Sequence, residues 1–265
     1  MDSRPAALHS VGVARTGAGE TVLSRVVRVL ETFGSDVTTL TVSQIARRSG
    51  LHVATVSRLV AQMARHELLQ RDGRSVRIGV RMWELGSRAS PTVGLREAAM
   101  PFMEDLHAVV GHHIQLGVLQ GDEVLFVERL AAPGAVINYT RIAGRLPLHA
   151  SSSGLVLCAH APVDLQERII AGPLTVYTER TISTPRRLRG TLADVRREGY
   201  AFCQGHIHPD ATGIAVPLRD SHGAVVAALA AIVPNDDTAR AQIPALLAAA
   251  RGVSRAMAGH EARRA

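Results

Sequence analysis

Polar side chains recur at helical spacing between residues 53 and 65, and their types are those that contact nucleic acids. At about 100° per residue, Thr55, Arg58 and Gln62 fall on one side of this segment, together with Arg65. A guanidinium can bind guanine through two hydrogen bonds or contact phosphate, a glutamine amide can pair with adenine, and a hydroxyl can donate to phosphate. The segment therefore predicts a helix whose exposed side could contact duplex DNA.

The opposite side of this segment is apolar. Val53, Val56, Val60 and Met63 share it, with Leu59 at its margin, so this stripe is expected to be buried against other helices. The polar side then faces outward, and the first turn of such a helix is the part that reaches base edges. Together with basic and polar residues expected beside that turn and on a neighbouring hairpin, the predicted DNA contacts are Ser43, Gln44, Arg47, Arg48, His52, Ala54, Thr55, Ser57, Arg58, Gln62, Arg74 and Arg77.

Three helices and a hairpin are predicted to position these side chains. Apolar residues recur at helical spacing over 22–33, and a capping-box pattern that begins at Thr41 opens a second helix over 41–49. The third helix runs over 53–65, and 70–79 predicts a hairpin with a turn at its Asp-Gly pair. This order of elements is that of a winged helix-turn-helix.

Charge is unevenly distributed along the chain. Residues 1–90 hold 13 Arg and 7 acidic residues, a balance of +6, whereas residues 91–265 hold 17 and 16, a balance of +1. A positive excess confined to one region favours a polyanionic partner there. The alternative for the polar side of 53–65 is an ordinary solvated face of a three-helix bundle. The turn at Gly50, the arginines of the hairpin and the charge balance favour DNA binding instead.

A boundary between two domains is expected where Ser90-Pro91 and Gly94 interrupt the pattern. Residues 80–89 have helical spacing and predict a connecting helix. The expected organisation is a flexible leader over 1–20, a winged helix-turn-helix over 21–79, a linker helix over 80–94 and a second domain over 95–260.

Hairpins alternate with helices in this second domain. A helix over 95–111 is expected to precede two strands within 113–130, joined at Gly121-Asp122, and a third strand is expected over 135–142. Helices are then predicted over 150–161, 163–171 and 184–199, a hairpin over 211–233 and a closing helix over 237–259. This pattern is typical of an α+β domain, in which helices pack on an antiparallel sheet.

Composition excludes several other classes of protein. Cys158 and Cys203 are 45 positions apart and form no C-x-x-C pair, which fits a reducing compartment without disulfides. No apolar run approaches the ~20 residues of a membrane span, and the first 20 residues lack the apolar stretch of a secretory signal. A cytoplasmic protein with no cofactor and no membrane partner is therefore expected.

Several blocks of the chain resemble one family. The run LTVSQIARRSGLHVATVSRLVAQMARHELLQRDGRSVRIGVRMWELG resembles the DNA-binding domain of IclR-type bacterial transcription regulators. The blocks LREAAMPFMEDL, GDEVLFVERL, GRLPLHASSSG and REGYAFCQGHIHPDATGIAVPLRDSHGAVVAAL resemble the effector-binding domain of that family, in the same order. Five blocks in sequence, spanning about residues 22–258, make the resemblance specific. It implies an N-terminal all-α winged helix-turn-helix and a C-terminal α+β, GAF-like effector-binding domain with an antiparallel sheet.

The resemblance also implies a small-molecule pocket in the C-terminal domain. Carried over by position, its effector-binding residues are Asn138, Leu146, Ser151, Ser152, Ser153, Gly154, Cys203, Ala211, Gly213, Ala230 and Ile232. The serines themselves favour an anion, because free amides at a helix N-terminus bind anions and hydroxyls add donors. The alternative is that Ser151 only caps the helix.

Some of these positions depart from the family's pattern. Cys203 to His206 stand where acidic residues are usual, Ala230 and Ile232 stand where some members have Ser, and Leu155 replaces a common basic residue. A pocket with fewer polar partners predicts an effector that is larger or more apolar than a small oxo-acid, such as an aromatic acid.

A metal site is the first alternative for the second domain. His206-x-His208-x-Asp210, with His112-His113 elsewhere, has residue types that bind metals, and this spacing would place two imidazoles on one face of a strand. A polar loop near the mouth of the pocket is the interpretation that we favour, so no metal is predicted.

Redox and hydrolytic chemistry are also weakly supported. Cys203 is expected to be structural or to line the ligand site, because nothing near it in sequence would lower the pKa of its thiol. Ser153 and His149 could form a hydrolase pair, but no G-x-S-x-G elbow is present. The arginines of 186–189 are interpreted as a solvated helix start. We therefore do not predict an enzyme.

The sequence thus predicts a ligand-responsive, sequence-specific DNA-binding regulator, either a repressor or an activator. Its expected partners are a palindromic operator in double-stranded DNA, a small organic effector and a second copy of the chain, because a single module of this kind buries little surface. The resemblance implies that such dimers pair into tetramers. The alternative is a metabolite-binding or hydrolytic C-terminal domain with a head that binds DNA without sequence preference.

Overall fold

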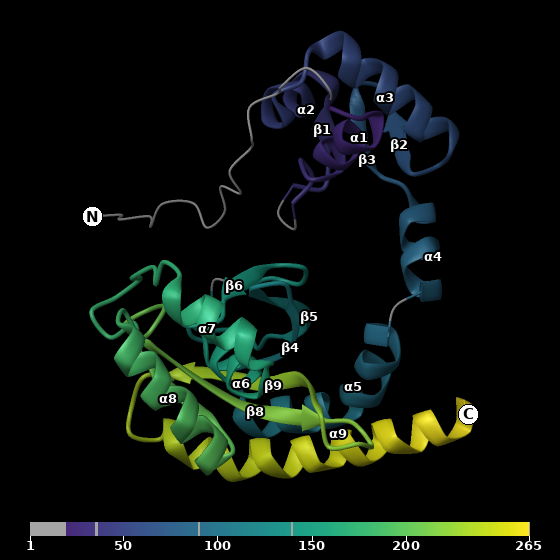
Figure 1. Cartoon of the computed structure of the whole chain (residues 1–265). Coiled ribbons are helices and arrows are strands. Elements are labelled where there is room, and N and C mark those ends of the chain that lie inside the picture. Colours follow the sequence, from purple (N-terminus) through teal and green to yellow (C-terminus); the bar gives the residue numbers. More distant parts are fainter. Residues whose placement is uncertain (1–19, 35–36, 90, 139, 265) are drawn as a thin grey trace. The chain divides into compact units, whose positions relative to one another are not determined.

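The computed structural model describes residues 20–34, 37–89, 91–138 and 140–264. Residues 1–19 of the expected flexible leader lie outside this set. The chain forms two compact units that divide between Arg88 and Ala89 (Figure 1). Among the described residues, no helix combines the length and the apolar character that a membrane span requires.

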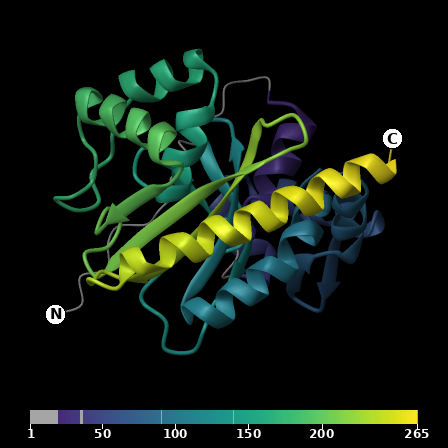
Figure 2. The same cartoon turned by 90° about the horizontal axis from the view of Figure 1, so that it is seen from below.

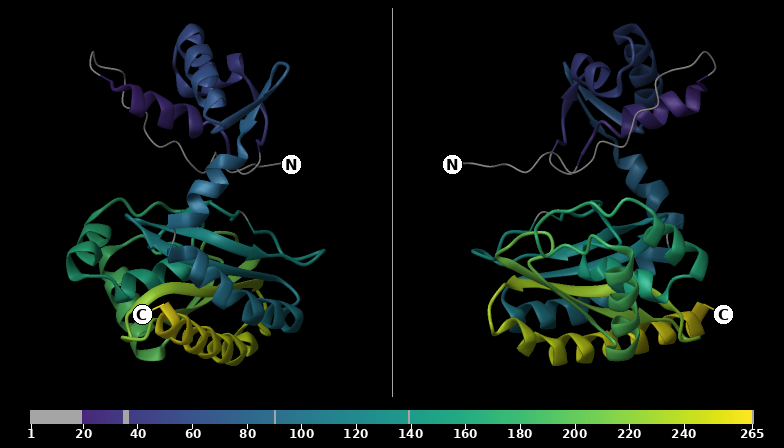
Figure 3. Two further views of the ribbon diagram at one scale, coloured as in Figure 1. Left: turned by 90° about the vertical axis from the view of Figure 1, so that its right-hand side faces the viewer. Right: turned by 60° about the vertical axis from the view of Figure 1, so that its left-hand side comes forward.

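The first unit is a helical bundle with a small sheet. Its elements are α1 (Val22–Leu30), β1 (Leu40–Thr41), α2 (Val42–Ser49), α3 (Val53–Arg65), β2 (Leu69–Asp72), β3 (Ser75–Ile78) and α4 (Val80–Ala89). The strands are antiparallel in the order β1-β3-β2, and Figure 3 shows the β2–β3 hairpin at the side of the helices. The predicted winged helix-turn-helix is confirmed. The short β1, which the sequence pattern did not predict, adds a third strand to the wing.

Local hydrogen bonds set the ends of the helices in this unit. The predicted capping box is confirmed: Thr41 Oγ1 accepts from the Gln44 amide at 3.3 Å, and Gln44 Oε1 accepts from the Thr41 amide at 2.8 Å. Gly50 follows α2 with a left-handed φ of 67°, which glycine adopts without strain. The chain can therefore turn sharply into α3. Glu67, after α3, holds a similar φ of 60°, although it carries a side chain.

Burial on α3 corrects one expectation. Val56, Leu59, Val60 and Met63 are buried in the core of this unit, so the stripe includes the residue that was expected at its margin. Val53 was expected in the same stripe, but it is 49% exposed. It is the first residue of α3, and the core of this unit contacts the helix only from Val56 onward. The helix is also confirmed over 53–65, whereas α1 ends at Leu30, before the predicted residue 33.

The second unit is a three-layer α+β domain. Its elements are α5 (Pro91–Val110), β4 (His113–Gln120), β5 (Glu123–Leu130), β6 (Arg145–Pro147), α6 (Ser152–His160), α7 (Val163–Ala171), α8 (Pro185–Glu198), β7 (Ala201–Gln204), β8 (Ala211–Arg219), β9 (Val225–Pro234), the 3-10 turn η1 (Ala239–Gln242) and α9 (Ile243–Arg264). The six strands are antiparallel in the order β6-β5-β4-β9-β8-β7. Figure 2 shows α9 lying across one face of this sheet beside α5.

Side chains along each strand point alternately to the two faces of the sheet, and each face is covered by a separate hydrophobic core. Ile114 and Leu116 of β4 lie in the core under α5 and α9. Phe126 of β5 and Ala230 of β9 lie in the other core, with α6 and α8. Because successive side chains of a strand point to opposite faces, Gln115 lies on the α6 side of the sheet. This is the face on which the cavity described below is formed.

Several expectations for the elements of this unit differ from the structure. The described residues of 135–142 form no strand, and the edge strand beside β5 is β6, which pairs Val124 with Leu146. The strand β7 was not predicted; it pairs with β8 at the sheet edge. The helix expected from residue 95 begins at Pro91, which fits the first turn of a helix because its missing N–H would have no partner there.

Candidate functional site

The predicted DNA contacts lie on the surface of the first unit. All of them are exposed except Thr55, which is half-buried. The segment that forms α2 and α3, residues 42–65, contains four Arg and no acidic residue. These two helices therefore present positive charge that no carboxylate of their own offsets.

Some of these side chains are already held by the protein. Gln44 belongs to the capping box, and Nδ1 of His52 accepts from the Ala54 amide at 3.3 Å as the cap of α3. One guanidinium nitrogen of Arg48 donates to the Thr32 carbonyl at 3.2 Å. Arg77 Nε donates to Gln70 Oε1 at 3.1 Å across the hairpin.

Other side chains of this surface have no such partner. Among the residues that the structure describes, the side chains of Arg47, Ser57, Arg58 and Gln62 make no hydrogen bond or ion pair. Three of the four lie on α3, on the side opposite its buried stripe. These groups are free to contact a ligand without breaking an internal bond.

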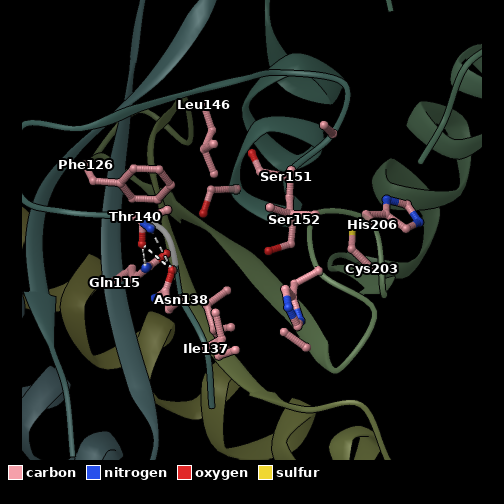
Figure 4. A pocket seen from close by; sticks show the side chains of 17 residues that line it. Gln115, Phe126, Ile137, Asn138, Thr140, Leu146, Ser151, Ser152, Cys203 and His206 are labelled. Carbon is pink, nitrogen blue, oxygen red and sulfur yellow. Dashed lines mark hydrogen bonds between the residues drawn. The ribbon is translucent and has the colours of Figure 1, made fainter. Parts of the chain in front are cut away.

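A cavity lies in the second unit between the sheet and the N-terminal end of α6 (Figure 4). Its empty volume is about 530 Å³, a figure that includes the open mouth. Phe126, Ile137, Leu146, Ile207 and Ile232 supply apolar walls. None of the described residues that line it is Arg, Lys, Asp or Glu.

Nine of the eleven residues implied by the family resemblance line this cavity: Asn138, Leu146, Ser151, Ser152, Ser153, Cys203, Ala211, Gly213 and Ile232. Gly154 and Ala230 do not line it. A Cβ at Gly154 would lie 2.5 Å from the Leu148 carbonyl oxygen, so this glycine allows the helix to contact the preceding loop. Ala230 is fully buried in the core between the sheet and α6.

Eight lining residues were not among the predicted effector contacts: Gln115, Phe126, Ile137, Thr140, Ala150, His206, Ile207 and His208. Gln115 carries the clearest sequence signal, because it is a polar residue between Ile114 and Leu116 in the first half of β4. Its side chain is 1% exposed, so it needs hydrogen-bond partners inside the fold. Ile137 and Thr140 come from the β5–β6 loop (residues 131–144), in which the sequence predicted a strand over 135–142.

Three serines form the N-terminal end of α6. Ser151 caps the helix by accepting from the Gly154 amide at 3.1 Å, and it also lines the cavity. The first intrahelical bond runs from the Leu155 amide to the Ser151 carbonyl, which leaves the amides of Ser152 and Ser153 without a helical partner. No described residue bonds the Ser152 or Ser153 hydroxyl. This end of the cavity therefore offers four donors.

Close packing brings this helix to the sheet. Gly213 of β8 faces Ser152, and a Cβ at that position would lie 2.8 Å from Ser152 Oγ. A Cβ at Gly117 of β4 would lie 2.6 Å from a methyl of Val124 and 3.6 Å from the Ser153 Cβ. The two glycines thus leave room on the sheet for the first turn of α6, and in Figure 4 the Ser152 side chain points into the cavity.

A second polar group lies at another side of the cavity, where Gln115 of β4 meets the β5–β6 loop. Gln115 Nε2 donates to Thr140 Oγ1, which in turn bonds Asn138 Oδ1 at 2.7 Å. The Thr140 amide also donates to Asn138 Oδ1, at 2.9 Å. Arg129 of β5 donates to the Thr140 carbonyl at 2.8 Å, and this bond holds the loop against β5. We call Gln115, Asn138 and Thr140 the amide cluster (Figure 4).

The histidines that were considered as metal ligands belong to the loop after β7. The expectation that His206 and His208 share one face of a strand is wrong, because the strand ends at Gln204 and Gly205 turns with a φ of 67°. Both line the cavity, as expected for a polar loop near its mouth. No group of three or more potential metal ligands occurs in the described part of the chain.

Burial sets the protonation of the remaining groups. It lowers the pKa of His206 to about 4, aided by nearby Arg187, so this imidazole is neutral at pH 7. Burial also raises the pKa of the Cys203 thiol to about 12, which leaves it protonated and weakly nucleophilic. His149 Nε2 lies 3.0 Å from the Thr175 carbonyl, so that nitrogen is occupied and does not serve Ser153 as a base.

Two family models match the chain. Residues 22–73 match the IclR helix-turn-helix domain, and residues 88–258 match the bacterial transcriptional regulator IclR C-terminal domain. The chain belongs to the IclR family. It is a transcriptional regulator with a helix-turn-helix DNA-binding domain and an IclR C-terminal ligand-binding domain.

Similar proteins agree with this assignment to the IclR family. The chain is 30% identical to the HTH-type transcriptional regulator BhcR of Paracoccus denitrificans, over 83% of this chain and 81% of BhcR. It is 27% identical to the HTH-type transcriptional regulator XynR of Escherichia coli, over 78% and 83% of the two chains. The crystal structure of an IclR homolog complexed with 4-hydroxybenzoate, from Microbacterium hydrocarbonoxydans, is 44% identical, with a TM-score of 0.86 over 89% of this chain and 99% of that one.

Proposed function

We propose that the protein is a sequence-specific DNA-binding regulator whose effector is a small aromatic carboxylic acid. The observation that carries this proposal is the composition of the cavity. Donors gather at the N-terminal end of α6, apolar side chains form the walls, and no described lining residue has a permanent charge.

The α6 end is suited to a carboxylate. Two free amides, the two unbonded hydroxyls of Ser152 and Ser153 and the positive end of the helix dipole favour an anion there without a counter-ion. The ring would lie against Phe126, Leu146 and Ile232, which bury apolar surface as it enters. A two-carbon or three-carbon oxo-acid would leave these walls uncovered.

The structural relative from Microbacterium supports the same chemical class. It is an IclR homolog complexed with 4-hydroxybenzoate, and its similarity to this chain extends over nearly the whole of both proteins. Two departures of this chain from the family's more polar pattern, Cys203 and Ile232, line the cavity and point in the same direction.

The first unit would read a palindromic operator as part of a homodimer, and two dimers would pair into a tetramer. Trp83 and Val80 of α4 are 73% and 72% exposed, and Leu23 of α1 is 72% exposed. Large apolar side chains that gather on exposed faces are typical of surfaces that contact another chain. In such a dimer the two DNA-binding units could adopt more than one spacing. The effector would change DNA affinity by binding more tightly to the protein in one spacing than in another, and residues 80–94 would transmit this effect.

One experiment tests both parts of this proposal. Duplexes bound by the full chain are recovered from a random pool at near-physiological salt, and the recovered site is footprinted with and without benzoate, 4-hydroxybenzoate, pyruvate and glyoxylate. We expect two protected half-sites related by a two-fold axis, with protection altered by an aromatic acid only. Enrichment of no sequence would overturn the sequence-specific reading, and a response confined to pyruvate or glyoxylate would overturn the effector class.

A further inference from the structure

The amide cluster has a hydrogen-bond pattern that fixes the orientation of every group in it. The Thr140 backbone amide is a donor, so the Asn138 atom that it contacts at 2.9 Å must be the oxygen. That oxygen cannot donate, so Thr140 Oγ1, 2.7 Å away, must give its own hydrogen to it. Thr140 Oγ1 is then an acceptor toward Gln115, and the Gln115 atom that meets it must be the nitrogen. Neither amide can be flipped without breaking a bond.

This assignment leaves two groups of the cluster unused. Asn138 Nδ2 is buried and has no hydrogen-bond partner among the described residues. Gln115 Oε1 accepts no hydrogen bond from the described residues either, although the Gln115 side chain is 1% exposed. An unsatisfied buried polar group is costly, and native folds leave few of them. Both residues line the cavity, so a ligand can supply what is missing.

One spare donor and one spare acceptor match a ligand group that can both accept and donate a hydrogen bond. A hydroxyl accepts one hydrogen bond and donates another, so it can satisfy Asn138 Nδ2 and Gln115 Oε1 together. A carboxylate only accepts and would be repelled by Gln115 Oε1, and an ether oxygen cannot donate to it. A hydrogen atom on an aromatic ring satisfies neither.

We propose that the amide cluster is the specificity-determining element of the cavity and recognises a ring hydroxyl of the effector, remote from the carboxylate held at α6. Figure 4 shows the cluster and Ser152 on different sides of the cavity, with Phe126 nearby. The effector class is therefore a hydroxylated aromatic acid. This inference rests on the proposed function, because it requires the carboxylate of an aromatic acid to bind at the N-terminal end of α6.

The amide cluster should discriminate strongly between a hydroxylated ligand and the same ligand without the hydroxyl. A site that is built to hydrogen-bond a hydroxyl rejects the analogue without it, because its buried polar groups are then left unpaired. Arg129 holds the Thr140 carbonyl, and Nε2 of His113 lies 2.7 Å from the Val136 carbonyl. The β5–β6 loop is thus tied on both sides of Asn138, so the cluster cannot easily turn its spare groups toward water.

Calorimetric titration of the full-length protein with four ligands tests the assignment. The ligands are benzoate, 3-hydroxybenzoate, 4-hydroxybenzoate and 4-methoxybenzoate. We expect at least one hydroxybenzoate to bind about tenfold or more tightly than benzoate, as the hydrogen bonds of a ring hydroxyl should allow. We expect 4-methoxybenzoate to gain nothing, because it cannot donate to Gln115 Oε1.

Two variants separate the two ends of the cavity. Asn138→Asp keeps the oxygen that Thr140 needs but replaces the spare donor by an acceptor, so the preference for the hydroxybenzoate should fall to about twofold or less. Ser152→Ala is the matched control at the other end. It should weaken benzoate and the hydroxybenzoate by the same factor, so that their ratio is preserved.

The outcomes are distinguishable. If benzoate and both hydroxybenzoates bind the wild-type protein equally, the amide cluster does not read a hydroxyl, while the proposed effector class stands. If Asn138→Asp retains the full preference, the assignment to this cluster is overturned. If none of the four ligands binds, the proposed effector class fails and this inference fails with it.

Discussion

Arg58 differs from several other arginines of the first unit because its guanidinium is uncommitted. Arg28 pairs with Glu20 at 3.0 Å and also donates to the Ser49 carbonyl, and Arg48 donates to the Thr32 carbonyl. Arg58 is exposed on α3 and has no such partner among the described residues. A guanidinium held by the protein fixes the fold, whereas a free one near the start of a recognition helix can bind a guanine edge.

Replacing Arg58 by Ala should therefore reduce discrimination between sequences. A bidentate contact to a base provides about 1 to 3 kcal/mol, so the Kd for the selected site should rise about 5-fold to 150-fold, and the Kd for a scrambled duplex should rise less. Both constants are measured by fluorescence anisotropy at one salt concentration. Arg65→Ala, at the far end of α3, is the matched control and should lower discrimination less. Equal losses on the two duplexes would assign Arg58 to phosphate alone.

At the scale of elements, the β2–β3 hairpin holds an arginine in place by a neutral partner, so its positive charge is not offset. Arg77 donates to Gln70 on the paired strand, and Gln70 is neutral, so the bond orients the guanidinium without cancelling its charge. Arg74 lies at the turn of the same hairpin and is exposed. Such a wing is suited to phosphate contacts, which fix the orientation of the unit on DNA and carry no sequence information.

Removing the charge of Arg77 should alter the salt dependence of binding. Each phosphate contact contributes about 0.9 to the slope of log K against log salt concentration, so Arg77→Ala should reduce that slope by about 1 and weaken binding to all duplexes alike. The slope is obtained from titrations at several salt concentrations. Gln70→Ala keeps the charge and should leave the slope nearly unchanged. An unaltered slope in Arg77→Ala would place the wing outside the DNA interface.

At the scale of the whole molecule, two buried imidazoles and one half-buried imidazole link the stability of the second unit to pH. Burial lowers the pKa of His113, of His149 and of His206, the last to about 4. Because each pKa is lower in the folded protein than its ordinary value of 6.5 in the unfolded chain, each imidazole binds fewer protons in the folded state when the pH is near or below 6.5. The unfolded state therefore binds more protons, and stability is lost as pH falls from 6.5 toward the folded pKa values.

The second unit should accordingly unfold more easily in mild acid. At pH 5.5 the contribution of His206 alone is about 1 kcal/mol, because pH 5.5 lies about one unit below the unfolded pKa. The thermal midpoint is compared at pH 7.5 and 5.5 for the wild type and His206→Asn, and the variant should show a smaller drop. His222→Asn is the control, because that exposed side chain is solvated in both states. Identical drops in wild type and His206→Asn would contradict the expectation.

The sequence by itself determined the helices and the hairpin of the first unit and their order, although it did not predict the short β1. The capping box at Thr41, the turn at Gly50 and the apolar stripe of α3 are local patterns, and each depends on residues within about one or two helical turns. The fold class of the second unit was also predictable, because its long strands and helices have clear periods. Local patterns were insufficient at 135–142, where side chains of β4 and β5, rather than a strand ladder, hold the described residues of the loop.

Only the tertiary structure decided the composition of the cavity. Ser151 to Ser153 and Cys203 were implied by resemblance, but Gln115, Phe126 and Thr140 come from other segments and meet only when the sheet is assembled. No local period in the sequence specifies that Gln115 of β4 will find Thr140 of a loop 25 positions away. The spare donor of Asn138 exists because these distant groups use its oxygen and leave its nitrogen unpaired. Whether a buried polar group has a hydrogen-bond partner depends on all the groups around it, and the packing of the whole domain decides which groups those are.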